Sequence, residues 1–405
     1  MQTRLLLLLA VTAVCLTATT PAYDQLNAAI RSDDVAAVER LVQSGQDVNS
    51  KGPQQVTPLH RAALIGSVKM MSRLIEMGAD VNEANATGAT PLMWATASPD
   101  KVRLLLEKGA DVNAKNKQGR TALLIAAANP RGTSVVRMLL AKGADIQHKD
   151  ELGTTALHAA GWAGNREVIG MLLERGLDPN QADEAGFTPL MNAVSANNEG
   201  SVQALLAAKA NVNAANTFGG KVKHGDIALK QVTPLMIAAP YGSPQMIRML
   251  LAAGADVNAR DSRQMTALMF AVATETQNPQ VVELLLNAKA DTTAKDIYGQ
   301  TAVDWARKFN NPRTLRILGD SARVPAARIV ETRGGSPATA DIAGSIAAIQ
   351  TASDSFFKAS GCVACHHQNI TAFAVSTARA HSVPVDEAAE QELIKATRYG
   401  WELAR

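Results

Sequence analysis

Apolar and polar positions recur along most of this chain at helical spacing and with a fixed period. A Thr-Pro/Ala-Leu/Val triplet opens each cycle, which continues through an apolar stretch and a turn such as Gly78-Ala79-Asp80-Val81-Asn82. A period of 30 to 35 residues predicts a solenoid of stacked helical hairpins. The triplets begin at Thr57, Thr90, Thr121, Thr155, Thr188, Thr233, Thr266 and Thr301, at intervals of 33, 31, 34, 33, 45, 33 and 35 residues.

The residue types in each cycle explain how such a unit folds. The threonine caps the first helix by accepting a backbone N–H bond, and the proline that often follows sits where a missing N–H costs little. Alanine pairs such as Ala62-Ala63 keep the first helix thin, while leucine pairs in the second helix fill the space between units. Glycines such as Gly78 end the second helix in the left-handed conformation. Lys209 and Lys289 replace this glycine, so we expect strained or altered turns there.

The motifs Thr57-Pro58-Leu59-His60 and Thr155-Ala156-Leu157-His158, together with the Gly-Ala-Asp-Val-Asn turns, resemble the ankyrin family over about residues 24 to 318. The resemblance implies an all-α ankyrin-repeat solenoid of stacked helix-turn-helix units with loop or hairpin tips. It also implies that the domain, residues 23–318, is a scaffold for protein–protein interaction that binds a protein partner on its concave face. Residues 24–49, which no such motif precedes, and the unit opened by Thr301 are expected to close the two ends.

One unit is longer than the others. In the other units the threonine lies eight residues after the last residue of the preceding turn, the position of Asn82 in the Gly78–Asn82 turn. Thr233 lies twenty residues after the equivalent residue, Asn213. The twelve extra residues predict an enlarged loop. It is either a tolerated surface insertion or a dedicated contact loop, because insertions and binding residues both concentrate in exposed loops.

The end of each first helix supplies the candidate partner-binding residues. In an ankyrin-like stack these positions border the concave face, so apolar side chains there are not explained by the core. Trp and Tyr dominate many interfaces, which favours Trp162 and Tyr241 as anchors. The alternative is that these side chains pack against neighbouring repeats. The candidates are Leu64, Ile65, Trp162, Tyr241 and Phe309.

Composition narrows the class of protein. Aromatic residues make up only 4% of the 405 residues, which favours a thin helical array over one large core. The formal charge is +3 and both signs are interspersed, so nothing indicates nucleic-acid binding. The chain contains no HExxH, GxSxG or phosphate-loop motif, and we therefore expect no enzymatic activity.

The N-terminus has the pattern of an export signal. Arg4 precedes an apolar run over residues 5–16, and Thr20-Pro21-Ala22 provides small residues at a cleavage site. We predict a signal peptide over residues 1–22 and an exported, periplasmic bacterial protein without a stable membrane span after cleavage. The alternative is an uncleaved N-terminal anchor.

The repeat stops after Leu318, and the remaining sequence differs in character. Residues 319–340 have the composition of a linker, and residues 341–405 predict a small helical segment. This segment contains Cys362-Val363-Ala364-Cys365-His366, the CxxCH attachment motif of c-type haem. Cys362 and Cys365 would bind haem c covalently and His366 would be the proximal iron ligand. His381 is a candidate second ligand, and an open sixth position is the alternative.

Haem attachment would give the scaffold an electron-transfer or sensing role. Two other readings of the CxxCHH cluster remain: a zinc site and a disulfide clip, either of which would leave a plain protein-binding module. The segment also resembles haem-motif segments that precede larger helical domains in exported bacterial proteins. That resemblance implies a domain that is incomplete within residues 341–405.

Overall fold

The computed structural model describes residues 21–217, 220–222, 225–227, 230–274, 277–309 and 311–319. Within them the chain forms successive pairs of short helices, as the 33-residue period predicts. The first helices of the pairs are α2 (Pro21–Arg31), α4 (Pro58–Ile65), α6 (Pro91–Trp94), α8 (Ala122–Ala127), α10 (Ala156–Ala163), α12 (Pro189–Ser195), α14 (Pro234–Tyr241), α16 (Ala267–Val272) and α18 (Ala302–Lys308).

The second helix of each pair follows after a short turn. These helices are α3 (Val35–Gln43), α5 (Val68–Glu76), α7 (Pro99–Glu107), α9 (Thr133–Ala141), α11 (Arg166–Glu174), α13 (Glu199–Ala207), α15 (Pro244–Ala252), α17 (Pro279–Asn287) and α19 (Pro312–Ile317). A 3-10 turn, Pro53–Gln55, precedes α4.

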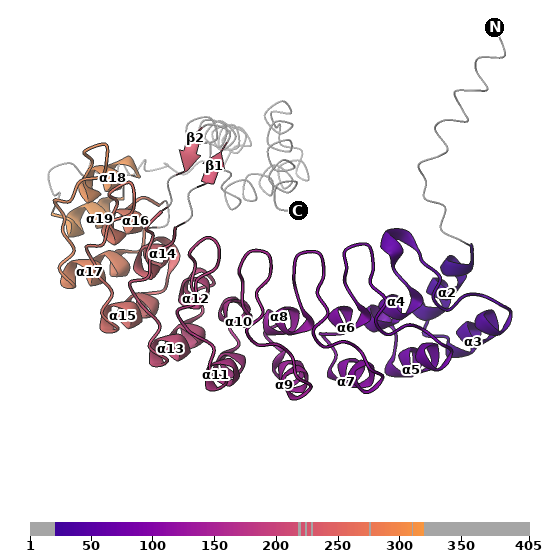
Figure 1. Cartoon of the computed structure of the whole chain (residues 1–405). Helices are drawn as coiled ribbons and strands as arrows, with labels where there is room; N and C mark the ends of the chain where they lie inside the picture. Colours follow the sequence, from indigo (N-terminus) through magenta and orange to yellow (C-terminus); the bar gives the residue numbers. More distant parts are fainter. Residues whose placement is uncertain are drawn as a thin grey trace, which may run out of the picture. The chain divides into compact units, whose positions relative to one another are not determined.

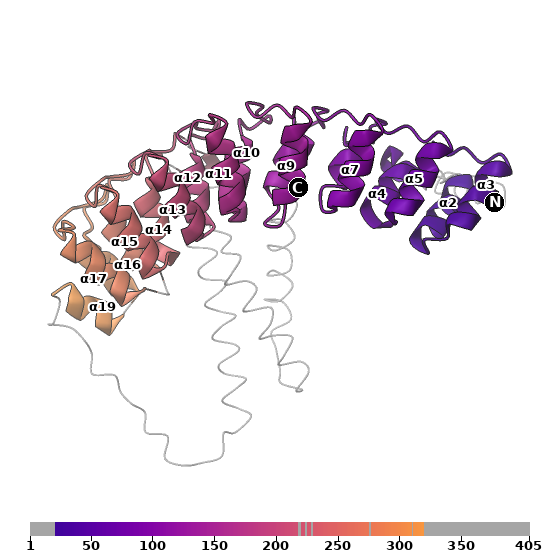
Figure 2. The same ribbon diagram turned by 90° about the horizontal axis from the view of Figure 1, so that it is seen from below.

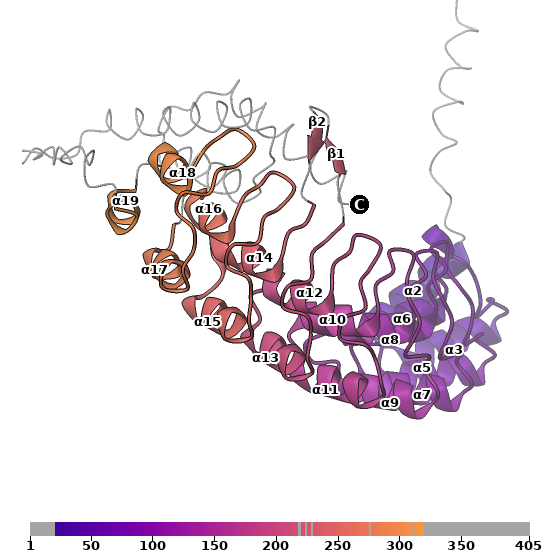
Figure 3. The ribbon, with the colours of Figure 1, turned by 60° about the vertical axis from the view of Figure 1, so that its left-hand side comes forward.

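The two sets of helices form two parallel rows. Figure 1 shows the first helices in one row, the second helices in a row beneath them, and the loops between units rising beyond the first row. Figures 2 and 3 show the pairs following one another in chain order. The predicted helical solenoid is therefore confirmed.

The repeated threonines start the first helices as expected. Thr57 and Thr155 each accept a bond from the backbone N–H three residues later, and a histidine at that third position bonds back to complete a capping box. Thr121, Thr188, Thr233, Thr266 and Thr301 also cap their helices, whereas Thr90 makes no side-chain cap bond. Most of these helices thus begin where an orphan N–H group finds a side-chain acceptor.

One hydrophobic core runs through the array. Many alanines of the first helices are almost fully buried, as at Ala62, Ala126 and Ala238. Leu105, Leu139 and Leu172, from the second helices, are fully buried in the same core. Since no single pair could bury its apolar face alone, each unit depends on its neighbours.

The turns after the second helices use the left-handed conformation. Gly78 has φ = 95° and Gly143 has φ = 83°. Lys209 and Lys289 adopt the same conformation, with φ of 63° and 66°. The expected strain at these two turns is confirmed, because non-glycine residues reach positive φ only at an energetic cost.

The loops between units are built around one acidic or amide side chain each. Asp150, for example, accepts bonds from the backbone N–H groups of Leu152 and Thr154 at 3.0 and 2.9 Å. Neighbouring loops are also joined, as by the Glu151 N–H that donates to Gln118 O at 3.0 Å. In the long unit, β1 (Gly220–Val222) and β2 (Gly225–Ile227) pair in a two-stranded sheet within the predicted insertion.

A second set of bonds clamps the turns of neighbouring units. Asn82 Nδ2 donates to Gly109 O at 3.1 Å, and Asn82 Oδ1 accepts from the Asp111 N–H at 2.7 Å. The same pair of bonds is made by Asn49, Asn113, Asn180, Asn213 and Asn258. The corresponding residue between the α8–α9 unit and the α10–α11 unit is Gln147, and no such bonds join these turns among the described residues.

Restoring this clamp should stabilise the array. We expect Gln147→Asn to raise the free energy of unfolding by about 0.5 to 1.5 kcal/mol, because asparagine has the reach that the other clamps use. Urea unfolding followed by circular dichroism measures the change. Gln118→Asn, in a loop outside the clamp series, is the matched control and should change stability little. An equal gain from both variants would mean that the clamp is not its source.

In the described part of the chain, no helix is long and apolar enough to cross a membrane. The predicted signal peptide lies outside the described residues except for Pro21 and Ala22, which open α2. The predicted linker beyond Gly319 and the whole segment 341–405 also lie outside them.

Candidate functional site

The predicted anchor residues lie at the surface. The exposed fraction is 57% for Trp162 and 75% for Tyr241, and Leu64 and Ile65 are about half exposed. Phe309 is half-buried at the end of α18. Packing against neighbouring repeats therefore does not account for Trp162 or Tyr241, because buried aromatic side chains lose most of their exposed area.

Besides Val68 on α5, three further apolar side chains are exposed outside the predicted candidate positions. Leu152 and Tyr298 lie at loop tips directly before a glycine with positive φ, and Ile297 lies one residue before Tyr298 in the same loop. The same position in other loops holds a polar or small residue, such as Gln118 or Ala185. An apolar residue before the loop glycine is thus the signal that would have found them.

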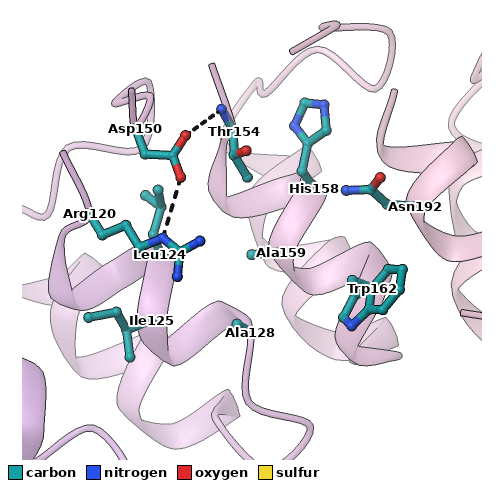
Figure 4. Close-up of a pocket in the computed structure, with 10 residues that line it drawn as sticks. All are labelled: Arg120, Leu124, Ile125, Ala128, Asp150, Thr154, His158, Ala159, Trp162 and Asn192. Carbon is teal, nitrogen blue, oxygen red and sulfur yellow. Dashed lines mark hydrogen bonds and ion pairs between the residues drawn. The ribbon is translucent and has the colours of Figure 1, made fainter. Parts of the chain in front are cut away.

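A pocket of about 260 Å³ opens beside Trp162 (Figure 4). Leu124 and Ile125 of α8 and Ala128, which follows α8, form one apolar side, and Ala159 and Trp162 of α10 form the other. Asn192 of α12 also lines the pocket. Residues of three successive first helices therefore line one pocket, of which only Trp162 was predicted.

The polar end of the pocket holds an ion pair. Arg120 Nε lies 3.5 Å from Asp150 Oδ2, with the arginine side chain 55% exposed and the aspartate side chain only 3% exposed. Asp150 Oδ1 is already bonded to two backbone N–H groups of its own loop. The carboxylate thus serves the loop structure, while the guanidinium faces solvent.

His158 lines the pocket but is occupied by structural bonds. Its Nδ1 lies 2.8 Å from the Thr155 hydroxyl and its Nε2 lies 3.0 Å from Phe187 O. Burial lowers the pKa of this imidazole, although the bond to Phe187 O opposes that effect. Both ring nitrogens are engaged, so His158 positions the loop and offers neither a metal ligand nor a catalytic base.

Charge is distributed unevenly over the loops around the pocket. The loop over residues 115–120 carries Lys115, Lys117 and Arg120 and no acidic residue. The loop over residues 182–187, beyond the pocket, carries Asp183 and Glu184 and no basic residue. The loop between these two, residues 149–154, carries Lys149, Asp150 and Glu151, so the charge of successive loops changes from basic to acidic across the pocket.

The predicted haem residues Cys362, Cys365, His366 and His381 lie outside the described residues. Within the described part of the chain, no group of three or more His, Cys, Asp and Glu side chains is arranged to hold a metal ion. The described residues therefore present exposed apolar side chains and a largely apolar pocket beside Trp162.

Comparison with protein families agrees with the repeat pattern. A family model described as ankyrin repeats (3 copies) matches overlapping stretches of the chain at residues 26–116, 99–183, 123–216, 182–261 and 235–326. These stretches together extend over well more than half of the chain. A search of curated proteins found no match.

Proposed function

The chain belongs to the ankyrin-repeat family, and from this we propose that it is a scaffold that binds a protein partner through its first-helix face. We define the first-helix face as the exposed ends of the first helices together with the adjoining loop tips. Ankyrin repeats support a role in protein–protein interaction, and no catalytic family is indicated. The partner and its binding surface are our proposal.

The exposed apolar side chains carry the proposal. Trp162 and Tyr241 both stand at the ends of first helices, and both are more than half exposed. Leu64 and Ile65, which are adjacent at the end of α4, are both about half exposed, and adjoining apolar residues on a protein surface often mark contact sites. Trp and Tyr are also the residue types that contribute most to interface energies. The pocket beside Trp162 adds the concavity that an anchor side chain from a partner requires.

Removing the two aromatic side chains should weaken partner binding without unfolding the array. We expect Trp162→Ala and Tyr241→Ala each to raise the Kd for a partner by about tenfold, the effect of losing roughly 1.4 kcal/mol at an interface. The partner is identified by cross-linking in the source cell, and its affinity for the purified protein is then measured by calorimetry.

The melting temperature distinguishes binding from packing. Both variants should melt close to the unaltered protein because their side chains are mostly exposed. The matched control is Leu74→Ala on the buried face of α5, which should lower stability by about 2 to 5 kcal/mol. A loss of that size in Trp162→Ala or Tyr241→Ala would assign these residues to the core instead.

We also propose that the chain is exported and binds haem c through Cys362 and Cys365, with His366 as the proximal iron ligand. The donor set fits this group, since two thiols three residues apart can form thioethers and the next residue supplies an imidazole. Haem would supply one-electron redox chemistry when bound, which suits electron transfer or sensing. The export pattern of residues 1–22 supports a compartment in which such attachment occurs.

A haem-attachment assay tests this second proposal. Protein made in a host competent for haem attachment should retain haem on a peptide around Cys362 after denaturation and proteolysis. Cys362→Ser and Cys365→Ser should each reduce this covalent haem, and His366→Ala should alter the visible spectrum. His381→Ala should convert a low-spin spectrum to high-spin if His381 is the second ligand.

Cys15→Ser is the matched control, because Cys15 lies before the proposed cleavage site and its loss should leave the haem yield unchanged. Stoichiometric zinc, or a disulfide between Cys362 and Cys365, in a protein without covalent haem would contradict the haem proposal. The protein-binding proposal would stand in that case.

A further inference from the structure

We propose that the pocket between α8 and α10 holds an acidic segment of the partner, with one apolar side chain inserted beside Trp162 and a neighbouring Asp or Glu carboxylate on Arg120. This inference rests on the proposed protein-binding function and names the chemistry of what is bound. Four observations support it: the shape of the apolar side of the pocket, the exposure of Arg120, the charge of the neighbouring loops, and the absence of the asparagine clamp at Gln147.

Two small residues create the apolar space. Ala128 occupies in its unit the place that Trp162 occupies in the next, and Ala159 likewise corresponds to Ile125. The large side chains thus form walls and the alanines leave room between them (Figure 4). A volume of about 260 Å³ lies below that of most small-molecule sites, about 300 to 1,000 Å³, and suits one apolar side chain.

Arg120 is placed to accept a carboxylate at the edge of this space. Its Nε lies at the long distance of 3.5 Å from Asp150 Oδ2, and the side chain remains more than half exposed. Among the described residues no other group bonds to its terminal nitrogens. Because a guanidinium presents paired N–H donors in a fork, it can bind a second carboxylate in bidentate fashion.

The loop charges favour an acidic segment on the α8 side. Lys115 and Lys117 are exposed on the same loop as Arg120, and no acidic residue accompanies them. Asp183 and Glu184, on the far side of the pocket, would repel a carboxylate placed there. Electrostatic complementarity of this kind sets orientation and discriminates between partners. The bound segment should therefore carry its acidic residues toward loop 115–120.

The missing clamp lies at the same boundary between units. Gln147 replaces the asparagine that elsewhere bonds the turns of neighbouring units, and the units it separates are those of α8 and α10. Fewer hydrogen bonds therefore join the turns that follow the second helices of these two units. The two units can thus move slightly apart more easily when a side chain is inserted between them.

A random-peptide display library, selected on the purified protein, tests the inference. Enriched peptides should combine an apolar residue with Asp or Glu. Arg120→Gln and Trp162→Ala should each weaken the binding of a selected peptide by about tenfold or more. Arg120→Glu should reverse the preference, so that the same peptide with its acidic residue changed to Lys binds this variant better than the original peptide does.

Tyr241→Ala is the matched control, since Tyr241 is an exposed aromatic residue on a first helix but does not line this pocket. Peptides that lose affinity for Tyr241→Ala but not for Arg120→Gln or Trp162→Ala would overturn the pocket assignment and leave the protein-binding proposal standing. Enriched peptides without acidic residues would overturn the stated chemistry. A library that yields no peptide sensitive to any of these substitutions would contradict both proposals.

Discussion

Gly161→Val should lower the free energy of unfolding by about 3 kcal/mol, a large loss for the substitution of one buried residue. Gly161 is buried in α10, where it faces α12. A Cβ atom at this position would lie 2.8 Å from Pro189 O, which belongs to the backbone at the start of α12. Since that oxygen cannot move without displacing the helix, the added side chain must separate the two units.

The other units opened by a threonine triplet have a larger residue at the corresponding position: Ala63, Thr96, Ala127, Val194, Ala239, Val272 and Arg307. The close approach at Gly161 is therefore specific to the boundary between α10 and α12. Gly161→Ala should have a smaller effect, about 1 to 2 kcal/mol, because the clash is partly offset by the better helix propensity of alanine. Urea unfolding and thermal melting followed by circular dichroism measure both losses.

The chain offers a matched control in the same unit. Gly170 lies within α11, and a Cβ atom there would meet no heavy atom within 4 Å. Gly170→Ala should therefore stabilise the protein by about 0.5 to 1 kcal/mol through helix propensity alone. If Gly161→Val were as stable as the unaltered protein, the packing of α10 on α12 would be looser than the structure indicates.

Stability should fall as the pH drops below about 6.5, because two buried histidines are held in their neutral form. His60 and His158 have no exposed surface, and their Nδ1 atoms each lie 2.8 Å from a threonine hydroxyl. Their Nε2 atoms lie 2.8 and 3.0 Å from the carbonyl oxygens of Ala89 and Phe187. Burial lowers the pKa of both imidazoles, and the bonds to these carbonyl oxygens only partly oppose it.

The sign of the effect follows from the lowered pKa. Above pH 6.5 both states of the protein hold neutral histidine, so the full stability is present. Below it the unfolded chain takes up protons that the folded protein resists, and unfolding becomes more favourable until the pH falls through the lowered pKa. Each histidine can contribute a slope of at most about 1.4 kcal/mol per pH unit.

The double variant His60→Gln/His158→Gln tests the cause. At pH 7 it should be less stable than the unaltered protein by about 1 to 3 kcal/mol for each site, since buried bonds are lost. Its stability should nevertheless change less between pH 7 and pH 5 than that of the unaltered protein. An unchanged pH dependence in the double variant would place its origin in other groups, such as the carboxylates of the loops.

Much of the fold could be predicted from the sequence because the information is local and repeated. The spacing of the threonine triplets predicted the helical pairs, and the residue types predicted most caps and the turn at Gly78. Even the departures at Lys209 and Lys289 could be interpreted, since the backbone conformation of a turn depends mainly on the few residues within it. The motif at Cys362 and Cys365 is also local, and its proposed chemistry rests on spacing alone.

The tertiary structure decided which of these residues are exposed and which line the pocket. Sequence left open whether Trp162 and Tyr241 face solvent, because the direction of a side chain at a helix end depends on how the neighbouring units pack. Arg120, Ile125 and Asn192 all line the pocket. Arg120 and Ile125 lie well more than thirty residues before Asn192 in the chain, so no local sequence pattern relates them. The sequence shows Gln147 where other units have asparagine. That this replacement removes a pair of hydrogen bonds between units followed only from the bonds that the asparagines make in the structure. Sequence periodicity determines the unit, whereas the space between units is set by side chains that meet only after stacking.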